Sequence, residues 1–154
     1  MPHAIETRLA ERGLTLPNAP APAANYVPWV ISGHQVYVSG QVSQTAAGLI
    51  RGKLGADLST EQGAEAARAC ALSLLAQLRA ALDGDFSRLR RVVKLVGFVN
   101  CTADFTDQPK VINGASDLLV DILGDAGRHA RSAVGAPSLP LGVAVEIEAI
   151  FEIA

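Results

Sequence analysis

The residues best suited to chemistry gather near the carboxyl end, where an arginine is followed fifteen positions later by a glutamate. Arg131 stands in the run ARSAVG, whose small residues leave room for an anion, and a guanidinium can hold a carboxylate through two parallel hydrogen bonds. Glu146 and Glu148 share one face of the last predicted strand, where a glutamate could orient a water molecule or move a proton. The same residues allow a purely structural role, in which Arg131 pairs with Glu146 or Glu148 across an antiparallel ladder.

Two long helices are predicted to support this region. One spans residues 59–83, where Ser59 and Gln62 form a capping box, apolar residues recur at helical spacing, and Gly84 ends the helix. The other spans residues 108–123, with Asp107 as its cap and a proline in its first turn. A shorter helix is expected at residues 4–13.

The strands are predicted from alternating or continuous apolar runs. They fall at residues 26–32, 35–40, 49–51, 91–101, 130–134 and 142–153. The run 91–101 is apolar on both faces, which predicts a central strand covered on both sides. Two helices are too few to cover both faces of such a sheet. We therefore expect an α+β fold whose mixed sheet carries both helices on one face and leaves the other to solvent or to other subunits.

Composition narrows the class of protein further. The chain has 154 residues, enough for one domain, and its 49% hydrophobic and 18% charged content excludes general disorder. A formal net charge of −2 disfavours a general nucleic-acid binder. The most apolar stretch, residues 92–99, contains Lys94 and is too short for a membrane span. The surplus of apolar residues favours a subunit interface.

The amino terminus and the cysteines indicate the compartment. Residues 1–24 are predicted to form a helix and a Pro/Ala-rich connector ahead of a domain at residues 25–154, without the pattern of a secretory signal. Cys70 and Cys101 form neither a disulfide framework nor a metal box, so we expect two buried thiols and a cytoplasmic protein. The three histidines are dispersed and no zinc motif is visible, so no metal is expected.

Several motifs together resemble the YjgF/RidA family, also called the endoribonuclease L-PSP family. They are VYVSGQ, Asn113, ARSAVG and SLPLGVAVEIEAI, and the resemblance runs from about Asn25 to the end of the chain. It implies a chorismate-mutase-like α+β fold and a homotrimer whose sheets form a central barrel, with helices outside and active sites in clefts between subunits. Residues 1–24 then resemble the amino-terminal extension of a longer branch of the family, and residues 25–154 its common domain.

The resemblance also implies an activity and its residues. The activity is hydrolysis of reactive enamine and imine acids, such as 2-aminoacrylate, to 2-keto acids and ammonia, without a metal or organic cofactor. Arg131 matches the arginine that binds the substrate carboxylate, and Glu146 matches the glutamate that positions the attacking water. Tyr26 and Asn113 match residues that line the substrate pocket. Ala133 stands where many active deaminases carry a cysteine that contributes mainly through its backbone.

Two other functions stay open. One is a regulatory trimer that binds a small carboxylate without turnover, which is favoured by the altered pocket residues Gly135, Ala136 and Pro137. The other is an endoribonuclease, which is disfavoured by the negative net charge and by the absence of a histidine pair and of an aromatic stacking platform. The basic cluster at residues 88–94 indicates a solvated strand edge rather than a nucleic-acid surface.

Overall fold

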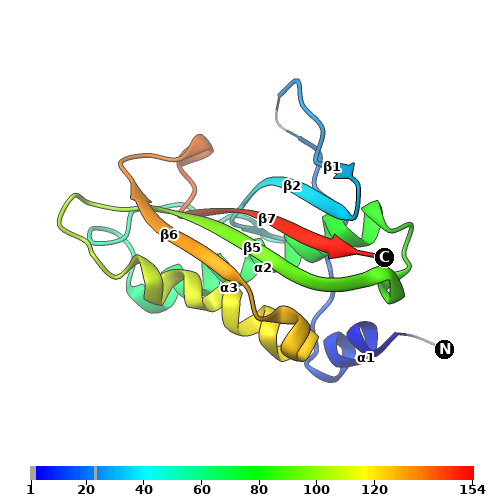
Figure 1. The fold of residues 1–154 in the computed structure, drawn as a ribbon. Coiled ribbons are helices and arrows are strands. Elements are labelled where there is room, and N and C mark those ends of the chain that lie inside the picture. The colour runs from blue at the N-terminus through cyan, green and yellow to red at the C-terminus, as the bar shows by residue number, and fades with distance from the viewer. Residues whose placement is uncertain (1–2, 23) are drawn as a thin grey trace.

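The computed structural model describes residues 3–22 and 24–154, which form a five-stranded mixed sheet with helices on one face (Figure 1). The predicted α+β class is confirmed. The helices are α1 (Ala4–Glu11), α2 (Thr60–Ala81) and α3 (Gln108–Leu123), with short 3-10 helices η1 (Phe86–Arg88), η2 (Gly124–Gly127) and η3 (Pro140–Gly142). The strands are β1 (Trp29–Ser32), β2 (Gln35–Val42), β3 (Gln44–Thr45), β4 (Gly48–Leu49), β5 (Leu89–Asn100), β6 (Ala130–Ala136) and β7 (Val145–Ile153).

The two long helices begin and end close to where their local signals predict. At the start of α2, the Ser59 hydroxyl accepts a hydrogen bond from the Gln62 amide at 3.2 Å, and the Gln62 side chain accepts one from the Ser59 amide at 2.8 Å. The predicted bounds of α3 coincide with the observed ones. The cap predicted for Asp107 is wrong, because its side chain makes no capping hydrogen bond and its backbone lacks the extended conformation that a capping residue normally adopts.

The strand order in the main sheet is β1-β2-β7-β5-β6. All neighbouring strands are antiparallel except β5 and β6, which run parallel and are joined through α3. The predicted strand at residues 91–101 therefore lies inside the sheet, but the middle position belongs to β7. The prediction that both faces of this strand are covered is wrong for the single chain. Val92 and Leu95 on the helix side are buried, whereas Val96 and Phe98 on the other face are only half-buried.

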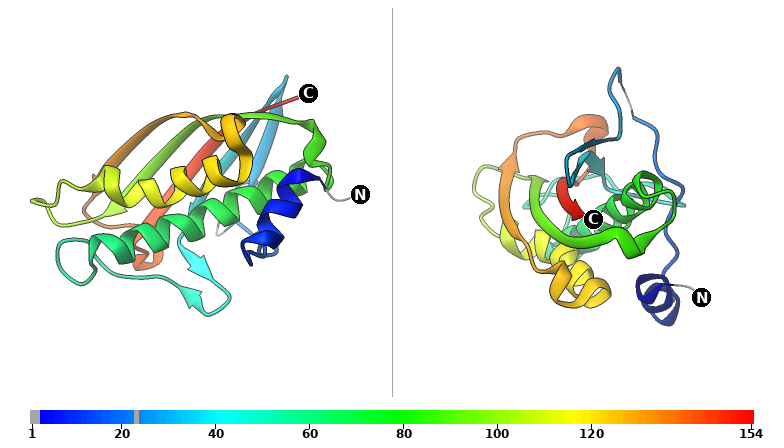
Figure 2. Two further views of the ribbon diagram at one scale, coloured as in Figure 1. Left: turned by 90° about the horizontal axis from the view of Figure 1, so that it is seen from below. Right: turned by 45° about the vertical axis from the view of Figure 1, so that its right-hand side comes forward.

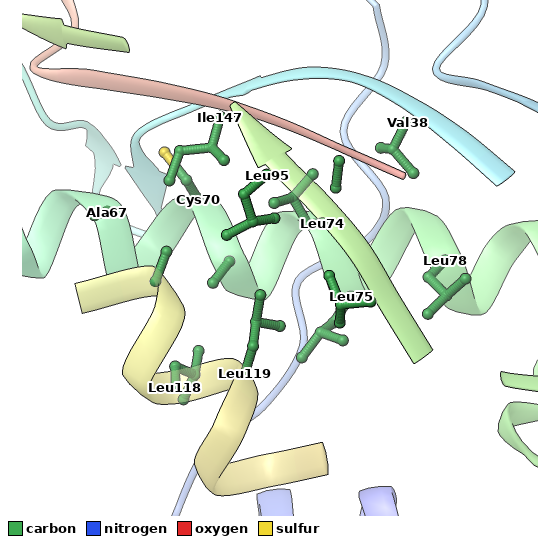
Figure 3. Packing of buried hydrophobic residues seen from close by; sticks show 14 of the residues in the cluster. Val38, Ala67, Cys70, Leu74, Leu75, Leu78, Leu95, Leu118, Leu119 and Ile147 are labelled. Atoms are coloured by element: carbon green, nitrogen blue, oxygen red, sulfur yellow. The ribbon is translucent and has the colours of Figure 1, made fainter. Parts of the chain in front are cut away.

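The helices pack on one face of the sheet, as predicted. Figure 2 (left) shows α2 and α3 side by side across the strands. Alternate residues of β7 are buried beneath them: Val145, Ile147, Ala149, Phe151 and Ile153. Figure 3 shows leucines of α2 and α3 meeting Leu95 of β5 and Ile147 of β7 in this core. A Cβ atom placed on Gly114 of α3 would lie 2.0 Å from the Ala64 carbonyl oxygen, so the two helix backbones touch there.

Hydrogen bonds connect the amino-terminal segment to helices α2 and α3. Arg8 of α1 donates to the Ile122 carbonyl of α3 at 2.9 Å. Beyond α1 the chain passes the β1 edge from the helix side of the sheet to its open side (Figures 1 and 2, right). On this path Gln77 donates to the Pro20 carbonyl at 2.7 Å and Arg79 to the Pro17 carbonyl at 3.3 Å. Across the described ranges, no helix is both long and apolar enough to cross a membrane.

Candidate functional site

Four of the five predicted site residues lie in two separate pockets. Arg131 and Asn113 line a pocket of about 300 Å³ between α3 and β6, which we call the arginine pocket. Glu146 and Tyr26 line a pocket of about 370 Å³ near β2 and β7, which we call the glutamate pocket. Ala133 is half-buried against the hydrophobic core and lines neither pocket. Tyr26 lies three residues before β1, so the predicted strand at residues 26–32 begins later than expected.

The strand order explains why the pockets are separate. Arg131 pairs with Leu95 of β5, whose side chain is buried against the helices, and residues paired across two strands share a face. Glu146 pairs with Phe98 on the other side of β5, and it faces the open side of the sheet. Because β5 stands between β6 and β7, an ion pair of Arg131 with Glu146 or Glu148 across an antiparallel ladder is excluded.

In the arginine pocket, the guanidinium of Arg131 is held by uncharged acceptors. Its Nη1 donates to the Ser116 hydroxyl at 3.0 Å, and its Nη2 donates to the Pro109 carbonyl at 3.1 Å. The Ser116 hydroxyl also lies 2.9 Å from Nε2 of His129, whose Nδ1 lies 2.6 Å from the Gly127 carbonyl oxygen. Since a guanidinium carries five N–H donors, two distinct hydrogen bonds leave three donors of Arg131 for a ligand.

The charges around Arg131 favour an anion. No carboxylate within residues 3–22 or 24–154 forms an ion pair with it. The pocket lining contains Arg128 and His129 but no acidic residue: Asn113, Ser116, Val120, Arg128, His129 and Arg131. Arg128 has its own partner, Asp125, at 3.3 Å. Arg131 is therefore the guanidinium of this pocket that has no carboxylate partner among the described residues.

The glutamate pocket is mostly apolar. Its lining comes from the connector and the residues between it and β1, from β2, β3 and β4, from the segment at η3 and from β7: Pro20, Ala21, Pro22, Ala24, Tyr26, Pro28, Gly40, Gln41, Val42, Gln44, Leu49, Pro140, Leu141 and Glu146. Burial raises the pKa of Glu146, and the negative charge of Glu148 raises it further. A carboxyl with a raised pKa is a stronger base when ionised and keeps its proton to a higher pH, which suits it to proton transfer.

Gly40 makes the space that Glu146 occupies. The register between β2 and β7 shifts between Val38 and Gln41, and Gly40 lies in this irregularity. A Cβ atom on Gly40 would lie 2.8 Å from Oε1 of Glu146, closer than such atoms approach in folded proteins. The glycine of the VYVSGQ motif thus allows the carboxyl group to lie against strand β2.

Ser116, His129 and Gly40 were not predicted as site residues from the sequence. Ser116 follows Asn113 by one helical turn, and His129 precedes Arg131 by two residues, so their spacing was a usable signal. What the sequence could not supply was the placement of α3 against β6. In the part of the chain that the structure describes, no group of three His, Cys, Asp or Glu side chains could hold a metal ion.

The structure thus combines a one-sided α+β sheet, the arginine pocket on one face and a half-buried carboxyl group on the other. The chain belongs to the family described as "YjgF/chorismate_mutase-like, putative endoribonuclease", whose model matches residues 6–152. Protein TCP17 of Trypanosoma cruzi is 50% identical to it over 151 residues, which cover 97% of this chain and 94% of that protein. The family resemblance seen in the sequence is thereby confirmed.

Solved structures share the fold over nearly the whole chain. The protein Atu1372 of Agrobacterium tumefaciens, with unknown function, has 50% identity and a TM-score of 0.92, covering 98% of this chain and 93% of that one. A "putative endoribonuclease" of Shewanella oneidensis has 37% identity and a TM-score of 0.94, covering 98% and 100%. Both matches leave only about 2% of this chain uncovered, which is far less than the share that residues 1–24 make up, so both include most of that segment. E. coli TdcF, solved with bound serine, has 25% identity and a TM-score of 0.63, covering 89% and 94%.

Proposed function

We propose that the protein hydrolyses small enamine and imine acids to 2-keto acids and ammonia, in clefts between the subunits of a homotrimer. The observation that carries this proposal is the division of the two functional groups. Arg131 has donors free for a carboxylate, and Glu146 has a half-buried carboxyl, yet the two lie on opposite faces of one sheet. In a cyclic trimer each interface joins two different patches, so one subunit can supply Arg131 and its neighbour Glu146.

The open face of the sheet supports such an assembly. It carries three large apolar or aromatic side chains that are between 43% and 50% exposed: Val30, Tyr37 and Val134. Exposed apolar patches on small domains mark interaction surfaces, because covering them removes apolar area from water. A trimer in which these faces meet would cover these side chains and leave both helices outside.

The chemistry follows from the two groups. Arg131 would bind the carboxylate of an imine acid and hold the neighbouring imine carbon near the glutamate pocket. Glu146, as a carboxylate, would accept a proton from a water molecule whose oxygen forms a bond to that carbon while the C=N electron pair moves to nitrogen. Glu146 then returns that proton to the nitrogen, which completes the carbinolamine. The carbinolamine loses ammonia as its hydroxyl proton moves to the nitrogen, and the 2-keto acid forms. The overall change is imine plus water to ketone plus ammonia, without oxidation or reduction.

The relatives and the cysteines agree with this proposal. TdcF was solved with serine, a small molecule that carries the α-carboxylate and nitrogen that the proposed substrate class also carries. Cys70 and Cys101 are free and buried, which suits a reducing compartment, and we place the protein in the cytoplasm.

The test is a turnover assay with 2-aminoacrylate generated in the reaction, in which keto acid and ammonia are measured above the spontaneous rate. Wild type should accelerate release of both products. Arg131→Ala and Arg131→Lys should each weaken binding of pyruvate about ten- to a hundredfold, because an ammonium cannot reproduce the planar fork. Glu146→Gln should keep pyruvate binding and lose turnover.

Two outcomes would lead to other functions. Wild-type protein that binds pyruvate through Arg131 but does not accelerate hydrolysis would be a carboxylate-binding regulator. Normal pyruvate binding by Arg131→Lys together with normal turnover by Glu146→Gln would remove both residues from their proposed roles.

A further inference from the structure

We propose that Ser116 and His129 are positioning residues for Arg131, which together fix the guanidinium in the orientation that receives a carboxylate. This inference rests on the proposed role of Arg131 in binding substrate. Neither residue is among those the family resemblance points to. Both are assigned here from their hydrogen bonds alone.

The chemistry of the two ends fixes the direction of two of the three hydrogen bonds in this chain of contacts, and the form of the His129 ring fixes the third. A guanidinium can only donate, so Ser116 Oγ must accept from Arg131 at 3.0 Å. A carbonyl can only accept, so Nδ1 of His129 must donate to Gly127 at 2.6 Å. In neutral His129 the other nitrogen, Nε2, is then an acceptor, and the Ser116 hydroxyl donates a hydrogen bond to it at 2.9 Å.

The contacts also join three separate elements. Ser116 belongs to α3, His129 lies just before β6, and Gly127 ends η2. Gly127 is buried so closely that a Cβ atom on it would lie 2.3 Å from the Leu119 carbonyl oxygen. The Gly127 carbonyl that accepts from His129 therefore belongs to closely packed, buried backbone. Through the hydrogen bonds of the imidazole and the Ser116 hydroxyl, this backbone restricts the orientation of Arg131.

This arrangement predicts how each residue contributes. Ser116 contacts Arg131 directly, whereas His129 acts only by holding the Ser116 hydroxyl with its proton turned away from the guanidinium. Removing either leaves Arg131 charged and still bonded to the Pro109 carbonyl, but with its orientation less restricted, so ligand binding has to order it further. Loss of one such hydrogen bond should weaken carboxylate binding about three- to tenfold.

The experiment measures pyruvate binding by titration calorimetry or ligand-observed NMR, with the melting temperature of each variant as a check on folding. Ser116→Ala and His129→Ala should each raise the Kd about three- to tenfold, and the double variant should be no worse than Ser116→Ala alone. Ser116→Thr keeps the hydroxyl and His129→Gln keeps an acceptor for it, so both should retain most of the affinity. Asp117→Ala, exposed next to Ser116 on α3, is the matched control and should bind as wild type does.

A second arm repeats the variants in an Arg131→Ala background. There, Ser116→Ala and His129→Ala should cause no further loss of pyruvate affinity, because they act only through the guanidinium. A further loss of similar size in that background, or wild-type affinity of Ser116→Ala, would overturn the inference. If Arg131→Ala itself binds pyruvate as tightly as wild type does, the proposed role of Arg131 fails first.

Discussion

Arg131 and Glu146 project from opposite faces of one sheet, and strand β5 separates the strands that carry them. Neighbouring strands lie about 4.8 Å apart, so the two backbones are roughly 10 Å apart across the sheet before any offset along it. A molecule the size of pyruvate cannot contact both side chains within one chain. Any function that uses both residues on one small ligand therefore requires a second copy.

This relationship predicts that two inactive variants will complement each other. Arg131→Ala and Glu146→Gln should each lack turnover when assembled alone. After unfolding, mixing in equal amounts and refolding, an interface that combines the intact arginine of one subunit with the intact glutamate of another should form in roughly a quarter of all cases. Turnover should return to about that fraction of the wild-type rate.

The control for this experiment is the same mixture combined without unfolding, which should stay inactive if subunits exchange slowly. Recovery that fails although mixed trimers are detected by native mass spectrometry would argue against a shared site.

The raised pKa of Glu146 predicts a pH-dependent stability difference. Its ordinary value is 4.5, and burial raises it in the folded protein, so the folded state binds this proton more tightly than the unfolded chain. The ionised carboxyl therefore destabilises the fold above the raised pKa, and this cost disappears below the ordinary value. Glu146→Gln should melt at a higher temperature than wild type at pH 7.5, and the difference should shrink to nothing near pH 4. A constant difference across this range would show that burial of the charge is not its cause.

Gly40→Ala should damage turnover more than folding. The new Cβ atom would lie 2.8 Å from Oε1 of Glu146, and the end of that flexible side chain can move away. We expect the turnover rate to fall at least tenfold with a stability change below about 1 kcal/mol. Ser39→Ala, the neighbouring change in the same strand irregularity, is the control and should keep most of the activity.

Gly114→Ala should destabilise the protein although alanine is the better helix former. Its Cβ atom would lie 2.0 Å from the backbone oxygen of Ala64, so α2 and α3 would have to separate. We expect a loss of about 1–3 kcal/mol in urea unfolding, after a gain of at most about 1 kcal/mol from helix propensity. Asp117→Ala on the exposed side of α3 should change stability by less than about 0.5 kcal/mol. A more stable Gly114→Ala would contradict the close helix contact.

The sequence alone determined the elements whose signals are local. The capping pair Ser59 and Gln62 marked the start of α2, and a proline in the first turn with an apolar stripe marked α3. The alternation along residues 145–153 predicted the strand and placed Glu146 and Glu148 on one face of it. These features are readable because the signals lie within a few residues of the structure they specify. Asp107 shows the limit of a local signal: its residue type suits a cap, but its φ of −93° and ψ of 28° differ from the extended conformation of a capping residue.

Only the tertiary structure decided how the site is divided. Strand order depends on which strands pair across long stretches of chain, and residue types along one strand do not specify its neighbours. The sequence allowed Arg131 to face a glutamate, but the parallel pairing of β6 with β5 turned it toward α3 and its partner Ser116. Insertion of β7 between β2 and β5 placed Glu146 on the other face beside Gly40. Side-chain direction follows from pairing and packing, so the two pockets became visible only in the folded chain.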